Sequence, residues 1–105
     1  MTTILENCEG FEWDDGNSNK NWHLHRVSDG ECEEIFFNLP IIIVFEKKRL
    51  YNEPRYIALG RTNTDRLLFI AFVIRKKLIR VISARDMTKS DKRRYEEKVK
   101  RNTDI

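Results

Sequence analysis

The chain has 105 residues and a formal net charge of +3, and its length is typical of one compact domain. We therefore expect residues 1–105 to form a single domain, with residues 1–9 as a loose lead-in. The longest apolar run, residues 39–45, is far shorter than the ~20 residues that a membrane span needs, and two cysteines are too few for a disulfide scaffold. The N-terminus lacks the pattern of a secretory signal. These features predict a cytoplasmic protein with no membrane association and with both thiols free.

Charge is distributed unevenly along the chain. Residues 1–53 contain 11 acidic and 5 basic side chains, whereas residues 54–105 contain 15 basic and 6 acidic ones. A net charge of −6 is thus followed by one of +9. Such asymmetry indicates a basic surface for a polyanion or an acidic partner, although the two halves can also neutralise each other within one fold.

The first predicted elements are a short strand and a weak helix. Residues 11–13 alternate between apolar and polar side chains, which is typical of a strand. A helix over about residues 15–25 would be capped by Asp14 or Asp15, because a carboxylate accepts the unpaired amides of a first turn. Its expected apolar contacts are Trp22 and Leu24.

A second helix is better marked. Ser28 and Glu31 have the spacing of a capping box, in which each side chain accepts a hydrogen bond from the other residue's amide. Cys32 and the residues three and four positions later fall on one apolar face. The helix should end near Asn38, because Pro40 pushes the residue before it out of the helical region.

The pattern next predicts four strands and a last helix. The strands lie over residues 41–45, 55–61, 66–75 and 78–85, and the helix over 88–101. The first and third runs are apolar on both faces, and 66–75 is expected to be central. Residues 75–77 should form a tight basic turn. The last helix begins with a capping box at Thr88 and Asp91 and packs through Tyr95 and Val99. The order β-α-α-β-β-β-β-α predicts a small α+β domain: a mostly antiparallel twisted sheet, helices packed on one side and a basic C-terminal helix.

Arginines on the predicted sheet are the candidate functional groups. No cluster of His, Cys and Asp has metal-ligand spacing and no glycine-rich phosphate loop is present, so we expect neither a metal nor a cofactor. Guanidinium groups bind phosphate oxygens bidentately, and several on one face would hold a phosphodiester and stabilise its transition state. The alternative is that they are solvated residues paired with the acidic half. Six lie within or at the ends of predicted strands: Arg55, Arg61, Arg66, Arg75, Arg80 and Arg85.

Three segments, in order along the chain, carry a family resemblance. The third and most specific is residues 80–85 (RVISAR), followed by Tyr95-Glu96; the second is residues 55–60 (RYIALG). The first contains Phe11, Trp13, Asp14, Asn21, His25, Val27 and Glu31. Together they resemble the BrnT family, ribonuclease toxins of bacterial type II toxin–antitoxin modules with a RelE-like fold.

The resemblance implies metal-independent RNA cleavage, in which the ribose 2′-OH attacks the adjacent phosphate. Arg80 and Arg85 are then the first candidates to hold the reacting phosphate. His25 is the family-matched side chain that exchanges protons readily near neutral pH, and is a candidate acid or base or a helix-end residue bonded to carbonyls. Tyr95 is a candidate to orient RNA or to pack the last helix. Further RNA-phosphate contacts are expected from Arg55, Arg61, Arg66, Lys92 and Arg93.

The implied partners are a BrnA-like antitoxin, the RNA substrate, and operator DNA reached through the antitoxin complex. The chain departs from the family where a lysine is usual but Asn17 stands, and where another basic residue is usual but Leu24 stands. These departures favour an alternative, a degenerate subunit that binds the antitoxin and aids operator binding without catalysis. A third possibility is a plain nucleic-acid-binding domain that uses the basic last helix, with steeply salt-dependent affinity.

One geometric condition applies to the two leading arginines. Arg80 and Arg85 are an odd number of residues apart, so in a regular strand they face opposite sides of the sheet. They can serve one site only if a bulge or the strand end intervenes.

Overall fold

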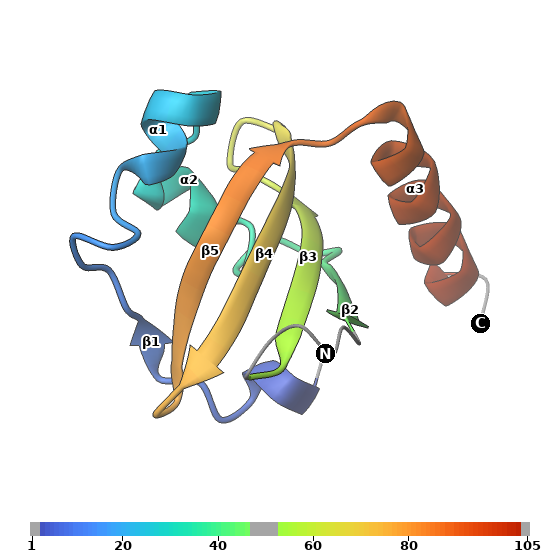
Figure 1. The fold of residues 1–105 in the computed structure, drawn as a ribbon. Coiled ribbons are helices and arrows are strands. Elements are labelled where there is room, and N and C mark those ends of the chain that lie inside the picture. The colour runs from blue at the N-terminus through green and yellow to red at the C-terminus, as the bar shows by residue number, and fades with distance from the viewer. Residues whose placement is uncertain (1–2, 47–52, 104–105) are drawn as a thin grey trace.

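The fold is a five-stranded mixed sheet with three α-helices (Figure 1). It is taken from a computed structural model that describes residues 3–46 and 53–103. The strands are β1 (Gly10–Phe11), β2 (Ile42–Glu46), β3 (Arg55–Arg61), β4 (Leu67–Arg75) and β5 (Leu78–Asp86). The helices are α1 (Lys20–His25), α2 (Asp29–Glu34) and α3 (Lys89–Thr103), and a 3-10 helix, Thr3–Leu5, precedes β1.

Strand order across the sheet is β1-β5-β4-β3-β2. The four long strands pair antiparallel with their neighbours along the chain, and β1 pairs parallel with the start of β5. β4 is central, as its apolar sequence predicts. Lys76 and Lys77 both have positive φ angles in the tight turn between β4 and β5, which is the geometry that a two-residue hairpin requires.

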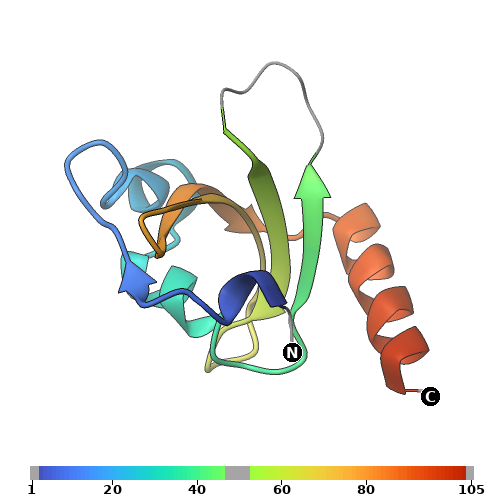
Figure 2. The ribbon, with the colours of Figure 1, turned by 90° about the horizontal axis from the view of Figure 1, so that it is seen from below.

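Helices cover both faces of the sheet, so the expectation that they pack on one side is wrong. Val27, Cys32 and Ile35, around α2, pack on one face against the even-numbered residues of β4. Tyr95 and Val99 of α3 pack on the opposite face, over β2 and β3. Figures 1 and 2 show the sheet between α2 on one side and α3 on the other. The physical reason is that β2 and β4 are apolar on both faces, and each face needs a cover.

Both predicted capping boxes are present. Ser28 Oγ accepts a hydrogen bond from the Glu31 amide at 3.0 Å, and the Glu31 carboxylate accepts one from the Ser28 amide at 3.1 Å. Thr88 and Asp91 make the same exchange at 3.1 and 2.9 Å. The second helix ends at Glu34 rather than near Asn38, and turns occupy the residues between.

The prediction for α1 is wrong in extent and in contacts. The helix begins at Lys20, and its N-cap Asn19 makes no side-chain capping bond. Asp14 instead accepts the Gly16 amide at 2.8 Å within a turn. Trp22 and Leu24 are 44% and 65% exposed. The side chain that α1 buries is the amide of Asn21, which hydrophobic patterning does not detect.

Candidate nucleic-acid interface

A β-bulge in β5 meets the condition that the two leading arginines face one side. Ser83 pairs with Ala71, but Val81 pairs with Phe72, so Ile82 is an extra residue on β5. Directly opposed residues of an antiparallel pair lie on the same face. Arg80 opposes Val73 and Arg85 opposes Phe69, both odd-numbered residues of β4. The bulge therefore brings Arg80 and Arg85 to the same side of the sheet.

The same side carries further arginines, and we call it the arginine face. By the register of β3 and β4, residues at odd positions share it. Its arginines are Arg55, Arg61, Arg75, Arg80 and Arg85. α3 covers this face over β2 and β3, which leaves β5 beside the first turn of that helix. Arg61 and Arg85 stand toward one end of the strands, and Arg55, Arg75 and Arg80 toward the other.

Arg80 is held by two carboxylates from the acidic half of the chain. Its guanidinium donates to both oxygens of Asp14, at 2.8 and 3.0 Å, and to Glu12 at 3.1 Å, and its side chain is only 13% exposed. Hydrogen bonding from Arg80 lowers the pKa of Asp14. A Cβ at Gly16 would lie 2.9 Å from the guanidinium, so glycine provides the room for this approach. Two carboxylates thus already occupy the charge of Arg80.

Arg85 is more open to an incoming anion. Its guanidinium lies 3.9 Å from the centroid of the Phe69 ring and donates to Asp91 at 2.7 Å, and its side chain is 34% exposed. Burial opposes ionisation of Asp91, but hydrogen bonds from Thr88 and Arg85 outweigh it and lower the pKa of that carboxyl. Asp91 thus links Arg85 to the first turn of α3. The aromatic face fixes the guanidinium plane without using its donors.

The other arginines of this face also have acidic or polar neighbours. Arg75 donates to the carboxylate of Glu53 through its Nε and Nη2 atoms, in an exposed ion pair. Arg61 donates to Asp65 at 3.4 Å, and the Tyr95 hydroxyl is the main cause that raises the pKa of Arg61. Within the described residues, Arg61, Arg75, Arg80 and Arg85 of this face are therefore each paired with a carboxylate.

Arg66 does not lie with these arginines. It joins the end of α1, the start of α2 and the end of β5: it donates to the carbonyls of His25 and Arg26 and to the carboxylates of Glu31 and Asp86. This position predicts a role in stability rather than in RNA contact. His25 is exposed at the last residue of α1, with its own carbonyl held by Arg66.

The remaining predicted residues lie on α3. Tyr95 is 3% exposed, and its hydroxyl donates to the Pro40 carbonyl at 2.7 Å, so in this conformation it packs the helix on the sheet. Lys92 and Arg93 are exposed, three and two residues before it. They directly follow Asp91, which holds Arg85, in the first turns of α3.

Sequence reasoning missed the acidic partners and the amides that border β5. Glu12 and Asp14 lie 68 and 66 residues before Arg80, and no local pattern connects them. The capping box predicts the contact of Asp91 with Thr88, but no sequence pattern predicts its second contact, with Arg85. Asn17, read as a departure from the family, is 3% exposed and donates to the carbonyls of Glu12 and Val81.

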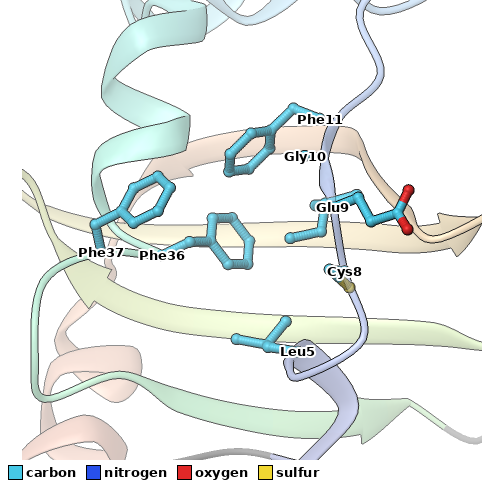
Figure 3. A pocket seen from close by; sticks show the side chains of 8 residues that line it. Leu5, Cys8, Glu9, Gly10, Phe11, Phe36 and Phe37 are labelled. Atoms are coloured by element: carbon cyan, nitrogen blue, oxygen red, sulfur yellow. The ribbon is translucent and has the colours of Figure 1, made fainter.

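A small apolar pocket lies away from these arginines. It has a volume of about 200 Å³ and is lined mainly by Leu5, Phe11, Phe36 and Phe37, with Cys8 and Glu9 at its side (Figure 3). Phe11 and Phe36 belong to the core on the face opposite Arg80 and Arg85. Burial raises the pKa of Cys8 here, and raises that of Cys32 to about 12, so neither thiol is activated as a nucleophile. The described residues contain no group of three or more His, Cys, Asp or Glu side chains placed to hold a metal ion.

The structure defines a small α+β protein with five arginines on one side of its sheet. A family model for the ribonuclease toxin BrnT of type II toxin–antitoxin systems matches residues 13–91. The chain therefore belongs to the BrnT family. The match includes both leading arginines and ends at Asp91, so Lys92, Arg93 and Tyr95 lie beyond it. A search among curated proteins finds none that matches. No helix in residues 3–46 and 53–103 is long and apolar enough to cross a membrane.

Removing the Tyr95 hydroxyl separates packing from catalysis. We expect Tyr95→Phe to lower the free energy of unfolding by about 1 kcal/mol, because one hydrogen bond to a backbone carbonyl is lost. The rate of RNA cleavage per folded molecule should be unchanged. Urea denaturation and a cleavage assay on the same preparation measure both quantities. A loss of cleavage of tenfold or more would restore Tyr95 to the reacting groups.

The acidic partners also predict how stability depends on pH. Asp14, Asp86 and Asp91 have pKa values below their ordinary 3.8 in the folded state. A lowered folded pKa stabilises the protein fully above 3.8, and this stability is lost as pH falls through the folded value. We expect the Tm to change little from pH 7 to about 5 through these groups and to fall below about 4. Asp86→Asn should reduce the size of that fall in thermal denaturation scans, whereas an undiminished fall would contradict the assignment.

Proposed function

We propose that the protein is an endoribonuclease toxin that cleaves RNA without a metal ion and is neutralised by a BrnA-like antitoxin. The observation that carries the proposal is the bulge in β5, which brings Arg80 and Arg85, at the two ends of the most specific family segment, to one face. A RelE-like arrangement, with RNA lying across the sheet, is part of this proposal. So is a cytoplasmic location.

The proposed reaction is an internal transesterification. The ribose 2′-oxygen forms a bond to phosphorus, the bond from phosphorus to the 5′-oxygen breaks, and the products are a 2′,3′-cyclic phosphate and a 5′-hydroxyl. One proton leaves the 2′-hydroxyl and one is delivered to the 5′-oxygen. The protein must therefore stabilise negative charge at phosphorus and supply a base and an acid.

Arg85 is the principal phosphate ligand in this scheme. The Phe69 ring holds its guanidinium, and replacing its single carboxylate partner, Asp91, by phosphate keeps the charge paired. Arg80 is the second ligand and exchanges Asp14 or Glu12 for a phosphate oxygen. Carboxylates already hold both guanidinium groups where the phosphate oxygens would bind. The guanidinium groups are therefore ordered before RNA binds, which reduces the entropic cost of ordering them.

The other predicted residues transfer protons, bind phosphate or pack the fold in this proposal. His25 is the candidate proton carrier, exposed at the end of the helix that borders β5. Arg55 and Arg61 extend the phosphate-binding surface along β3, and Lys92 and Arg93 extend it onto α3. Tyr95 acts by packing α3 on the sheet, and Arg66 acts by holding α1 and α2 in place.

The test is cleavage by the purified protein in EDTA. A defined single-stranded RNA should be cut to products with 2′,3′-cyclic phosphate and 5′-hydroxyl ends, and the same sequence with 2′-deoxy sugars should remain intact. The deoxy substrate is the matched control, because it keeps every phosphate and base but removes the nucleophile. Cleavage of both substrates, or products with 5′-phosphate ends, would exclude the proposed reaction.

A second candidate is a subunit that binds the antitoxin and has lost catalysis. The pairing of Arg80 with two carboxylates favours it, since a resting salt bridge is also what a purely structural arginine would make. The two candidates differ in cells. Induction of an active toxin arrests growth, and the arrest is absent from the Arg85→Ala variant, whereas a degenerate subunit leaves growth unchanged in both while still forming a stable complex with its antitoxin.

A further inference from the structure

The outer edge of β5 is bordered by side chains where no strand pairs with it. β1 pairs only with Leu78 and Ile79. Beyond that point, Asn17 Nδ2 donates to the Val81 carbonyl at 3.1 Å, Lys20 Nζ donates to the Ile82 carbonyl at 3.0 Å, and Asn21 Oδ1 accepts the Ala84 amide at 2.9 Å. These three backbone groups flank and include the bulged residue.

A strand could not supply these contacts in the same way. A bulge places two residues of one strand against one of the other and leaves the backbone spacing irregular, so a regular strand cannot follow the outer edge. Separate side chains, Asn17 from the turn before α1 and Lys20 and Asn21 from its first turn, reach each group individually. Asn17 and Asn21 are 3% and 1% exposed, so their bonds are shielded from water.

Asn21 retains its place at a cost. Its Nδ2 group is buried and makes no hydrogen bond within the described residues. A buried unpaired donor is unfavourable, and an apolar side chain of similar size would avoid it. An apolar side chain would, however, leave the Ala84 amide without an acceptor. The hydrogen bond that Asn21 does make is to Ala84, two residues after the bulged Ile82 and next to Arg85.

We propose that Asn21, with Asn17 and Lys20, is a positioning residue for RNA cleavage: it holds the bulge that places Arg85 on the same face as Arg80. The inference rests on the proposed function, and it adds residues in and just before α1 that do not touch substrate. Asn21 acts through the backbone at Ala84, and Arg85 is the next residue.

The central test compares Asn21→Leu with Asn21→Asp. Leucine removes the acceptor for the Ala84 amide, whereas aspartate keeps an acceptor at the same position. We expect Asn21→Leu to lower kcat on the order of tenfold to a hundredfold, as a misplaced catalytic group does, with a smaller change in KM. Asn21→Asp should recover most of that loss. Hydrogen exchange at the Ala84 amide should accelerate in the leucine variant and remain slow in the aspartate variant.

A stability control and a double variant complete the design. Cys32→Ala removes buried volume beneath α2, away from the β5 edge, so it lowers stability without removing any bond to the bulge. Its kcat should equal that of the wild type at a temperature where all variants are folded. In the Arg85→Ala background, Asn21→Leu should cause no further loss beyond about twofold, because residues that act through one another are not additive.

Several outcomes would overturn the proposal. These are an unchanged kcat in Asn21→Leu, an equal loss in Cys32→Ala, or an equal further loss in the Arg85→Ala background. If the wild-type chain does not cleave RNA, the proposed reaction fails by itself, and affinity for the uncleavable 2′-deoxy oligonucleotide becomes the readout. Asn21→Leu and Arg85→Ala should then weaken binding non-additively. Additive weakening, or none from Asn21→Leu, contradicts the positioning role.

Discussion

Replacing Arg85 by alanine is expected to reduce the rate of RNA cleavage about 10²–10³-fold, the loss typical of removing one donor to a developing negative charge. Of the two leading arginines, Arg85 has the more accessible guanidinium, and Phe69 and Asp91 already orient it. Initial rates on a defined RNA, with enzyme and variant in EDTA, measure the effect. Arg85→Lys should recover only part of it, because an ammonium cannot bind phosphate bidentately or stack on the ring in the same way.

Arg75→Ala is the matched control for charge. It removes one arginine from the same face but from an exposed pair with Glu53, at the far end of the strands. Its effect on cleavage should be no more than a few-fold. Equal losses in the two variants would mean that the face acts through its overall charge, and the specific role of Arg85 would then be wrong.

Replacing Arg66 by alanine is expected to cost about 2–3 kcal/mol of folding free energy, with little effect on cleavage by the molecules that remain folded. The side chain joins four partners from α1, α2 and β5, and its loss removes the guanidinium from two carbonyls and from the Glu31 carboxylate, which then keeps only its hydrogen bonds from Ser28. Hydrogen bonding to Asp86 is the main cause that raises the pKa of Arg66, so its charge persists at every pH of interest. Chemical denaturation monitored by tryptophan fluorescence measures the loss.

Arg75→Ala serves again as the comparison, since exposed ion pairs contribute about 0–1 kcal/mol. The sequence alone assigned Arg66 to RNA contact. A stable Arg66→Ala variant with weakened RNA binding would restore that assignment and contradict the structural role.

The elements of the fold could largely be predicted because their signals are local. The Ser28 and Thr88 capping boxes, the two-sided apolar runs of β2 and β4, and the basic turn at Lys76 each depend on neighbouring residues. The placement of α3 could not be read in this way. Its narrow stripe of Tyr95 and Val99 fits either face of the sheet, and the choice depends on which face α2 already covers.

The candidate site was predictable in its residue types but not in its geometry. Family spacing pointed to Arg80 and Arg85, while strand periodicity placed them on opposite faces. The conflict is resolved by Ile82, an extra residue with no sequence signature of its own. Contacts that hold it come from Asn17 and Asn21, more than 60 residues earlier in the chain, and such pairings are visible only in three dimensions.

The carboxylates beside Arg80 and Arg85 have a consequence for the thermodynamics of RNA binding. The counterions released on binding are those condensed on the RNA, and each phosphate that a cation neutralises releases its share. Where an arginine gives up the protein's own carboxylate to bind a phosphate, that carboxylate keeps its negative charge and attracts a cation, so fewer ions are released in total. The dependence of RNA affinity on salt concentration should therefore be shallower than the number of arginine contacts suggests. Asp14→Asn should steepen it, since Arg80 would then keep only one of its two tethered carboxylates, that of Glu12. If RNA binds as proposed, we therefore expect the carboxylates beside Arg80 and Arg85 to make its affinity less sensitive to ionic strength.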